Sequence, residues 1–263
     1  MDLKLNGKLA LVTGSSAGIG KGIAKCLLQE GATVFINGRN ADALAKTAEE
    51  LSAFGPCHMA VGDLGTAEGA QAVIDAVDQF GELDILVGNM GTYKGTPFAE
   101  ISDEEWEWMM NINLLSQVRM CRHFLPKMLE RNRGRIVLIA SECGIKPLTD
   151  MVHYSVSKTA VIGLARALAE TTKGTKVAVN SLLPGLTWTE NTAAYQTDRA
   201  RREGKDLDQA IKEYFVTYEP TQLLQRITTV EEIASTVVYY CSEVSAATNG
   251  ATIRAEGGLI RSI

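Results

Sequence analysis

Short apolar runs alternate with longer amphipathic stretches along almost the whole chain. The runs are rich in Val, Ile and Leu, and they read KLALVTG, ATVFING, PCHMAVGD, LDILVGN, GRIVLIAS, KVAVNSLL and ATIRAEGG. Strands that are apolar along their length and separated by helices are typical of a parallel sheet covered by helices on both faces. The pattern therefore predicts an α/β fold built on a doubly wound, parallel, seven-stranded sheet.

Helical periodicity fills the segments between the runs. We expect helices at 18–30, 41–54, 67–80, 102–130, 151–172 and 230–243. Ser102 and Glu105 have the spacing of a capping box at the start of the long fourth helix. The polar, charged stretch at 187–218 interrupts the pattern, so we expect one domain over residues 1–263 with this insertion as a helical lid over the substrate.

Composition and charge exclude several classes of protein. The five cysteines form no Cys-x-x-Cys pair and the three histidines show no ligand spacing to them, so neither a disulfide framework nor a metal site is expected. A net charge of −5 argues against nucleic acid as a partner, and the basic stretch at 198–205 is interrupted by acids, as on a solvated helix face. The apolar run near the N-terminus is too short for a signal or membrane segment, which predicts a cytoplasmic protein with no membrane partner.

A glycine-rich turn follows the first expected strand and opens the first helix. TGSSAGIG, at 13–20, places glycines at Gly14, Gly18 and Gly20. Glycines there let the backbone approach a pyrophosphate at a helix N-terminus, where free N–H groups and the helix dipole favour an anion. The turn predicts a dinucleotide site, the alternative being a structural turn.

Arg39 follows the second expected strand, where an NAD site usually carries an acid that binds the ribose 2′-hydroxyl. A guanidinium at this place suits a 2′-phosphate, whose geometry matches its planar fork. We therefore expect NADP(H) as the cofactor, with NAD as the alternative.

With these residues in hand, the chain resembles the short-chain dehydrogenase/reductase family nearly from end to end, and in particular its 3-oxoacyl-acyl-carrier-protein reductase-like members. The turn at 13–20 is similar to the family's Thr-Gly-x-x-x-Gly-x-Gly, and LVGNMG at 86–91 to its Asn-Asn-Ala-Gly, with Gly88 and Met90 as departures. PGLTWT at 184–189 and RAEGG at 254–258 resemble two further family motifs. The resemblance implies a Rossmann-like fold and an oxidoreductase.

The same resemblance implies the site residues. The implied catalytic set is Asn113, Ser141, Tyr154 and Lys158. The cofactor-binding positions, including the glycine turn and Arg39, are Gly14, Ser16, Gly18, Ile19, Gly20, Arg39, Asp63, Leu64, Asn89, Gly91, Tyr154, Lys158, Pro184, Gly185, Thr187 and Thr189.

Tyr154 and Lys158 stand four positions apart, which on a helix puts both side chains on one face. An ammonium about 5.5 Å away would lower the pKa of the phenol by about two units, to around 8. The family mechanism then implies hydride transfer between nicotinamide and a carbonyl carbon, with Tyr154 donating the proton and Ser141 holding the oxygen. Asn113 would hold a water that links Lys158 to solvent.

Substrate and assembly are less constrained. We expect Met90, Glu142, Ile145, His153, Trp188 and Tyr195 around the substrate, which is a ketone or a 3-oxoacyl thioester, or alternatively an alcohol, sugar or steroid oxidised with NAD. A basic group at 127–135 would favour a carrier protein. A dinucleotide-binding sensor without turnover is a further alternative. The family suggests a homotetramer or dimer through the long helix and the Tyr154 helix, where Ala160, Gly163 and Ala167 permit close approach.

Overall fold

The structure is a computed structural model that describes residues 1–262. Within them seven strands form one parallel sheet in the order β3-β2-β1-β4-β5-β6-β7. The strands are β1 (Leu9–Val12), β2 (Thr33–Gly38), β3 (Cys57–Val61), β4 (Ile85–Gly88), β5 (Arg135–Ile139), β6 (Ala178–Pro184) and β7 (Thr252–Ala255). Six of them lie inside the apolar runs and β6 extends one residue beyond its run, to Pro184, so the predicted doubly wound α/β fold is confirmed.

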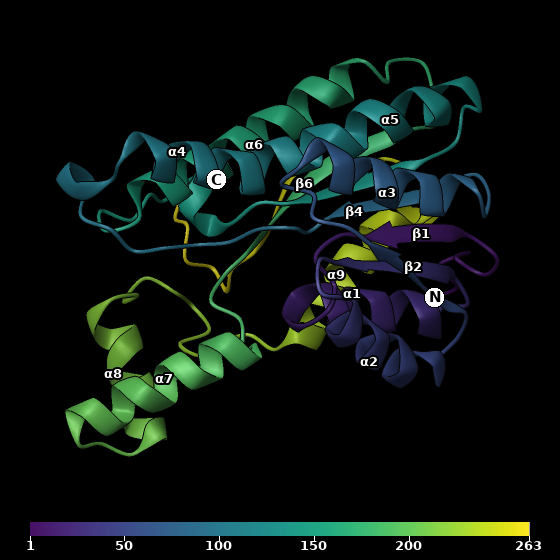
Figure 1. Cartoon of the computed structure of the whole chain (residues 1–263). Coiled ribbons are helices and arrows are strands. Elements are labelled where there is room, and N and C mark those ends of the chain that lie inside the picture. The colour runs from purple at the N-terminus through teal and green to yellow at the C-terminus, as the bar shows by residue number, and fades with distance from the viewer. Residues whose placement is uncertain (263) are drawn as a thin grey trace.

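Helices cover both faces of the sheet (Figure 1). One layer contains α1 (Gly18–Gln29), α2 (Ala41–Ser52) and α9 (Val230–Cys241), and the other contains α3 (Ala67–Asp78), α5 (Ser116–Glu130) and α6 (Val152–Glu170). A separate apolar core lies under each layer. Leu11 and Leu86 point into the core under α3, α5 and α6, whereas Val12 and Val87 point into the other core, as alternation along a strand requires.

The predicted long helix at 102–130 is interrupted. Its first part is α4 (Asp103–Met110), a π-helical turn occupies Asn111–Leu115, and α5 follows. The Ser102 hydroxyl accepts the Glu105 N–H at 3.2 Å, but the Glu105 carboxylate accepts from Thr96 and Lys94 rather than completing a capping box. The expected capping box is therefore wrong here, and a complete one occurs at Thr229 and Glu232, where α9 begins.

Two helices form a hairpin that extends from one end of the sheet. They are α7 (Glu190–Glu203) and α8 (Leu207–Thr217), and Figure 1 shows them in green, set apart from the two helical layers. Gly204, with φ of 65°, ends α7, and the Asp206 side chain caps α8 by accepting the Gln209 N–H at 2.9 Å. Arg199 packs between the rings of Tyr214 and Tyr218, so the two helices hold each other.

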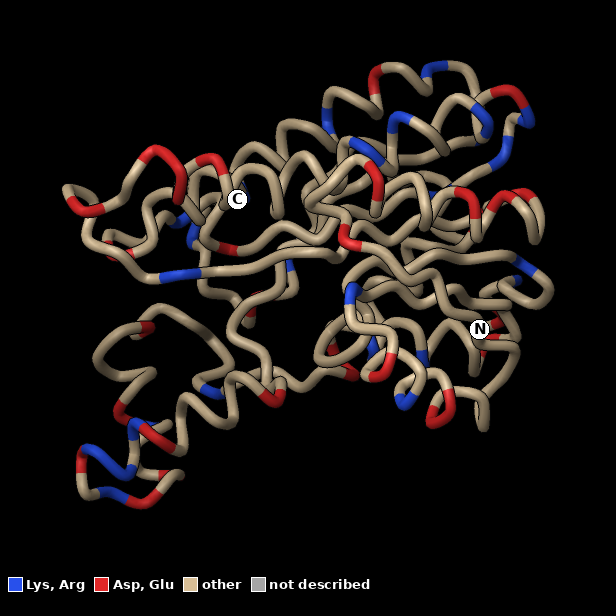
Figure 2. The backbone as a smooth tube through the Cα atoms, in the orientation of Figure 1, with Lys and Arg blue, Asp and Glu red and all other residues tan. Residues whose placement is uncertain are grey.

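Charged side chains are distributed over the chain with both signs intermixed (Figure 2). In α7, Arg201 and Arg202 both pair with Asp198 and stay exposed, as expected for a solvated face, whereas Arg199 is buried against α8. Within residues 1–262, no helix combines the length and the apolar character that crossing a bilayer requires.

Candidate active site

The candidate residues gather at the carboxyl edge of the sheet, where the strand order changes direction. The chain runs outward from β1 to β2 and β3, then returns to β4 on the other side of β1. Loops leaving β1 and β4 diverge at such a point and leave a crevice between them, which is where open α/β sheets bind ligands. The glycine turn follows β1, and Asn89 follows β4.

The glycine turn is packed tightly against the end of β4. A Cβ added at Gly20 would lie 2.5 Å from Asn89 Nδ2 and 2.6 Å from the Gly14 carbonyl oxygen, and one added at Gly14 would lie 2.9 Å from Met90 Cα. Gly14 and Gly18 also adopt positive φ of 59° and 56°. These positions exclude any larger residue, and they keep the start of α1 close to the crevice.

Asn89 binds the turn to β4. Its amide Nδ2 donates to the carbonyls of Thr13 and Gly14, each at 2.9 Å, and its backbone N–H donates to the Thr13 hydroxyl at 2.9 Å. The departures at Gly88 and Met90 therefore leave these hydrogen bonds in place. Gly88 gives room to neighbouring side chains, because a Cβ there would lie 2.8 Å from a Leu138 methyl group.

The cradle fits a dinucleotide pyrophosphate. The backbone N–H of Gly18, at the start of α1, donates at 3.1 Å to the carboxylate Oε2 of Glu190, so an anionic oxygen already binds where a phosphate oxygen is expected. Ser16 lies beside the end of β2, within 3.4 Å of a Cβ added at Gly38. Arg39 comes next and is exposed, and among residues 1–262 no carboxylate pairs with it. A free guanidinium beside the turn is consistent with a phosphate ligand.

The remaining cofactor positions border the same crevice or support it. Asp63 Oδ1 accepts the Gly65 N–H at 2.9 Å, and Leu64 is buried. Pro184 ends β6, and Gly185 lies so close to Glu256 that a Cβ there would be 2.8 Å from its Cα. Thr189 caps α7, and its methyl carbon lies 3.4 Å from a Cβ added at Gly18.

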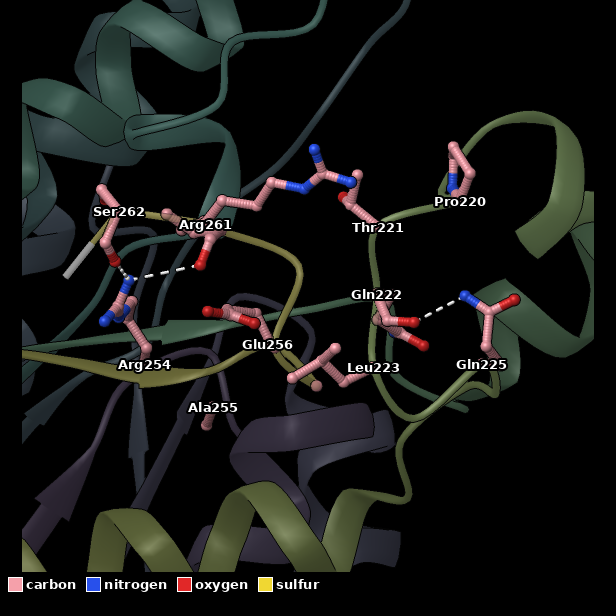
Figure 3. Close-up of a pocket in the computed structure, with 13 residues that line it drawn as sticks. Pro220, Thr221, Gln222, Leu223, Gln225, Arg254, Ala255, Glu256, Arg261 and Ser262 are labelled. Carbon is pink, nitrogen blue, oxygen red and sulfur yellow. Dashed lines mark hydrogen bonds between the residues drawn. The ribbon is translucent and has the colours of Figure 1, made fainter.

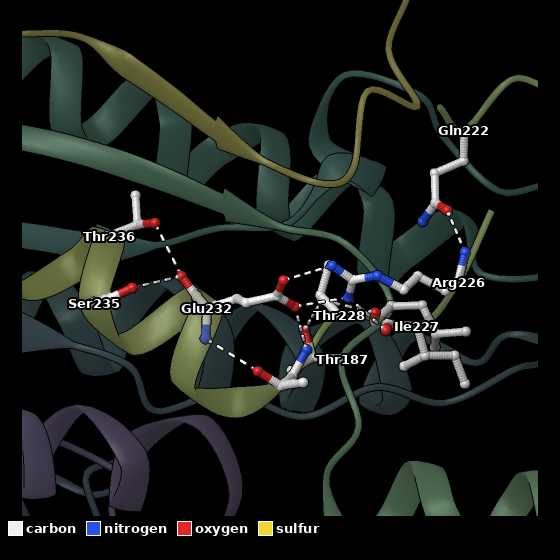
Figure 4. A network of polar contacts seen from close by, with 10 residues as sticks. Thr187, Gln222, Arg226, Ile227, Thr228, Glu232, Ser235 and Thr236 are labelled. Atoms are coloured by element: carbon white, nitrogen blue, oxygen red, sulfur yellow. Dashed lines mark hydrogen bonds and ion pairs between the residues drawn. The ribbon is translucent and has the colours of Figure 1, made fainter. Parts of the chain in front are cut away.

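Thr187 belongs to a polar network that fixes the strand connection leading to α7 (Figure 4). Its hydroxyl lies 3.2 Å from that of Thr228, and Arg226 binds both carboxylate oxygens of Glu232, at 2.8 and 2.6 Å. This pairing lowers the pKa of Glu232 to about 2. The network connects the chain around Thr187 to the start of α9. It therefore fixes the position of the segment that leads from β6 to α7.

Ser141, Tyr154 and Lys158 come together between β5 and α6. Ser141 lies two residues beyond the end of β5, close enough to Tyr154 that its hydroxyl partly offsets the rise in the Tyr154 pKa that burial causes. Lys158, buried one turn along α6, has its Nζ 5.8 Å from the centre of the Tyr154 ring and donates to the Ile139 carbonyl at 3.1 Å. The helical spacing therefore puts the amine beneath the phenol, as the sequence predicts.

The expected lowering of the Tyr154 pKa to around 8 does not occur in this structure. Burial raises the pKa of Tyr154, and the carboxyl group of Glu142 and the thiol of Cys143 raise it further. Burial also lowers the pKa of Lys158 to about 8, so its ammonium is only marginally stable. The sequence argument counted the attraction of the cation and left out the desolvation of both groups. The phenol is thus held in its protonated form.

Asn113 lies in the π-helical turn and links three segments. Its Oδ1 accepts the Thr92 N–H at 2.7 Å, and its Nδ2 donates to the Thr92 carbonyl at 3.0 Å and to the Ser157 hydroxyl at 2.8 Å. A Cβ added at Gly91 would lie 3.2 Å from Lys158 Nζ and 3.4 Å from Asn113 Oδ1. Asn113 and Lys158 are therefore neighbours across Gly91, with the Asn113 amide engaged by protein groups.

Several expected pocket residues have other surroundings. His153 is buried between α4 and α6, with Nε2 3.1 Å from Glu105 Oε1 and its ring against Trp106. It therefore supports the packing of two helices. Ile145, Trp188 and Tyr195 are exposed, which fits the walls of an open cleft.

The basic group at 127–135 lies at the wrong end of the sheet for a carrier protein. Arg135 starts β5 and Ser141 follows its end, so they are separated by roughly 20 Å of extended chain. The cations also have partners: Lys127 pairs with Asp78 at 2.6 Å, and Arg131 with Glu82 at 3.0 Å. The group therefore carries no argument for an acyl-carrier substrate.

A cavity of about 740 Å³ lies beside the base of the hairpin (Figure 3). It is lined by residues 220–225 and by the C-terminal segment from Arg254 to Ser262, and the four catalytic candidates are not among its described lining residues. On one wall the Gln225 side-chain amide donates to the Gln222 backbone carbonyl at 2.5 Å.

Sequence reasoning missed three polar residues of the site. Asn37, buried in β2, accepts the Gly14 N–H at 3.2 Å and so positions the glycine turn. Ser157 joins Asn113 to the Tyr154 carbonyl, and Glu190 binds the Gly18 N–H. An asparagine within an otherwise apolar strand was the one signal available for Asn37, because a buried polar side chain needs a partner.

Comparisons with known proteins find relatives over the full length of this chain. A family model described as short chain dehydrogenase matches residues 8–200. An uncharacterized oxidoreductase of Bacillus subtilis, YvrD, is 51% identical over the full length of both chains. The crystal structure of L-sorbose reductase from Gluconobacter frateurii, complexed with NADPH and L-sorbose, superposes with a TM-score of 0.94 at 31% identity and covers 100% of both chains. A 3-oxoacyl-(acyl-carrier-protein) reductase from Agrobacterium tumefaciens with NADP bound gives a TM-score of 0.88 at 30% identity, with 97% of this chain and 95% of that one covered.

Proposed function

The chain belongs to the short chain dehydrogenase family, and on that premise we propose that it is an NADPH-dependent reductase of a small ketone. The observation that carries the proposal is the grouping of Ser141, Tyr154 and Lys158 beside the glycine turn. This grouping contains a hydroxyl to hold a carbonyl oxygen, a protonated phenol to donate to it and an amine beneath the phenol.

Reduction is favoured as the direction because it consumes a proton. A hydride added to the carbonyl carbon leaves a negative charge on the oxygen, which must then receive a proton from a nearby acid. Tyr154 is held protonated by burial and by Glu142, so it is ready to act as that acid. Bound NADPH supplies the hydride, and the protein supplies the positioning and the proton.

Assignment of NADP(H) rests on Arg39 and on the relatives whose structures contain NADPH or NADP. Arg39 is exposed at the end of β2, where the 2′-phosphate would lie, and the glycine turn and Thr189 would hold the pyrophosphate. Replacing Arg39 by Asp removes the cation and adds a repelling charge. We expect the ratio of kcat/KM with NADPH to kcat/KM with NADH to fall by about 100-fold, the effect of a lost charged contact. Steady-state kinetics with both cofactors measure this, and an unchanged ratio contradicts the assignment.

The function is tested by NADPH oxidation with a panel of small ketones and by Tyr154→Phe. Phenylalanine keeps the ring and removes the proton donor, so kcat should fall by about 10²- to 10⁴-fold while NADPH still binds. Cofactor binding is measured separately by NADPH fluorescence. A Tyr154→Phe variant that turns over at nearly the normal rate, or a wild-type protein that binds NADPH and reduces no carbonyl compound, would refute the proposal in favour of a sensor.

The α7–α8 hairpin is proposed to cover the substrate as a lid. Trp188 and Tyr195 are exposed, and the hairpin begins beside the glycine turn, where the Thr189 methyl carbon lies 3.4 Å from a Cβ added at Gly18. Closure of such a segment excludes water from the reacting groups.

A homo-oligomer is proposed from the outer face of α6. Val156, Gly163 and Ala167 follow one another at intervals of seven and four residues, and all three are exposed. They therefore do not pack on their own sheet, and they form a flat face of small and apolar residues that suits a second copy of the chain.

A further inference from the structure

Glu142 follows the candidate catalytic serine in the chain, and its carboxylate is hydrogen-bonded to the Ser141 hydroxyl. The Ser141 hydroxyl donates to Glu142 Oε2 at 2.6 Å, and it accepts the Cys143 N–H at 3.2 Å. Glu142 begins a short helical turn after β5, and the residue is partly buried. The carboxylate therefore borders the place where a carbonyl oxygen must bind.

One hydrogen atom limits what Ser141 can do. A serine hydroxyl has a single proton to donate, and a carbonyl oxygen can only accept. When Ser141 turns its proton toward a substrate carbonyl, it withdraws that proton from Glu142. The carboxylate then lies in a partly desolvated site without its donor, and losing a hydrogen bond to a charged group is costly there.

A hydroxyl group on the substrate can donate a hydrogen bond to Glu142 in place of Ser141. Ser141 Oγ and Glu142 Oε2 are 2.6 Å apart, and a carbonyl oxygen and a hydroxyl oxygen on adjacent carbons have a similar separation, on the order of a hydrogen-bond distance. The carbonyl oxygen can then accept from Ser141 while the neighbouring hydroxyl donates to Glu142. Resting on the proposed reductase function, we propose that Glu142 is a specificity-determining residue that selects ketones with a hydroxyl on the adjacent carbon.

The surrounding charges favour the same neutral substrate. Burial raises the pKa of Glu142, and the buried carboxyl group of Glu219 nearby adds to that rise. The closest cation, Lys146, is engaged by Glu219 at 2.7 Å. A carboxylate on the substrate would meet the two acids Glu142 and Glu219. The amine of the site, Lys158, lies beneath the Tyr154 ring and has its pKa lowered to about 8 by burial, so 2-oxo and 3-oxo acids are disfavoured by charge. A thioester next to the reacting carbonyl brings no donor for Glu142.

The test compares four substrates with NADPH and the full-length protein. Hydroxyacetone carries the donor, 2-butanone replaces its hydroxyl by a methyl group, methoxyacetone keeps the electron-withdrawing oxygen without a donor, and acetoacetate is the anion. We expect wild-type kcat/KM for hydroxyacetone to exceed that for methoxyacetone and 2-butanone by about 10- to 100-fold, the range for a hydrogen bond to a charged group. Acetoacetate should be the poorest of the four.

Glu142→Ala removes the acceptor and frees the Ser141 proton. The ratio of hydroxyacetone to methoxyacetone should fall to within about threefold of unity, since the variant gains nothing from the donor. Glu142→Gln should give an intermediate ratio, because a neutral acceptor is about half as strong, and should reduce acetoacetate better than the wild type. Glu49→Gln, an exposed acid on α2, is the control and should keep the wild-type ratio.

Two results would overturn the inference while leaving the reductase function intact. The first is a wild-type enzyme that reduces 2-butanone and methoxyacetone as well as hydroxyacetone. The second is an unchanged ratio in Glu142→Ala. If Glu142→Ala does not fold, the kcat/KM values of the wild-type enzyme for the four substrates still show whether an adjacent hydroxyl is selected. A wild-type protein that reduces none of a broad panel of carbonyl compounds refutes the reductase function itself, and the inference with it.

Discussion

At the scale of single residues, the site depends on groups whose ionisation is shifted by burial. The Lys158 amine lies in the core of the site, where burial lowers its pKa to about 8, and the Tyr154 phenol is shifted in the opposite direction. Both shifts favour the neutral form. In the free protein the pair therefore stores a proton on Tyr154 rather than releasing it.

The Lys158 pKa predicts how stability varies with pH. In the unfolded chain a lysine has a pKa of about 10.4, so between pH 8 and that value the unfolded state holds a proton that the folded state lacks. Lys158 should therefore contribute a free energy of unfolding that rises with pH over this window by up to about 1.4 kcal/mol per pH unit, measured as the difference between the wild type and a variant without the amine. Lys158→Met lacks this contribution. Urea denaturation of both proteins between pH 7.5 and 9.5 measures the difference, and parallel curves would contradict it.

At the scale of helices and strands, periodic patterns in the sequence predicted the regular elements. Local departures from regular structure were missed. Seven apolar runs predicted the seven strands because strands in a parallel sheet covered on both faces are mostly apolar along their length. Tyr154 and Lys158 were placed correctly because helical spacing alone puts them on one face. The π-helical turn at Asn111–Leu115 was missed, since its extra residue leaves the apolar pattern on both sides intact. The Ser141–Glu142 hydrogen bond was also missed, because adjacent residues meet only where the chain leaves the strand in a particular direction.

The glycine turn is the element that tolerates change least. In Gly20→Ala, the new methyl group would lie within 2.8 Å of Asn89, Gly14 and Ser15. Two of these contacts are with backbone, so the turn must shift, at a cost of about 1 to 3 kcal/mol in the free energy of unfolding and with weaker NADPH binding. Thermal denaturation and NADPH titration measure both effects. Gly81→Ala is the matched control, because its nearest new contact is 3.9 Å away, and equal behaviour of the two variants would rule out this account.

At the scale of the whole molecule, the fold leaves two surfaces without a covering layer. One is the crevice at the glycine turn, and the other is the outer face of α6, where Gly163 has no atom within 4 Å of an added Cβ among the residues that the structure describes. Neither surface could be assigned from sequence, because the small residues of α6 fit equally well against the protein's own sheet. Only the arrangement of the layers separates the two possibilities.

Because the outer face of α6 is exposed, we predict that it forms a contact between copies of the chain and that one charged side chain introduced there disrupts this contact. Ala167→Glu places a carboxylate in the proposed contact between copies, where burying an unpaired charge is strongly unfavourable. We expect analytical ultracentrifugation to show a smaller species than the wild type, with the folded state retained by circular dichroism. Ala53→Glu, exposed at the end of α2, serves as the control. Identical sedimentation of Ala167→Glu and wild type would argue against this interface.

The Glu190 carboxylate and a cofactor phosphate compete for the same N–H group at the start of α1. The Gly18 N–H has one hydrogen, which the Glu190 carboxylate now accepts from the first turn of α7. A phosphate oxygen that takes this hydrogen must first evict a group of the same charge. Binding of a dinucleotide phosphate at the Gly18 N–H would therefore displace Glu190 and break this contact between the hairpin and α1. The hairpin would thus respond to the cofactor without contacting the substrate.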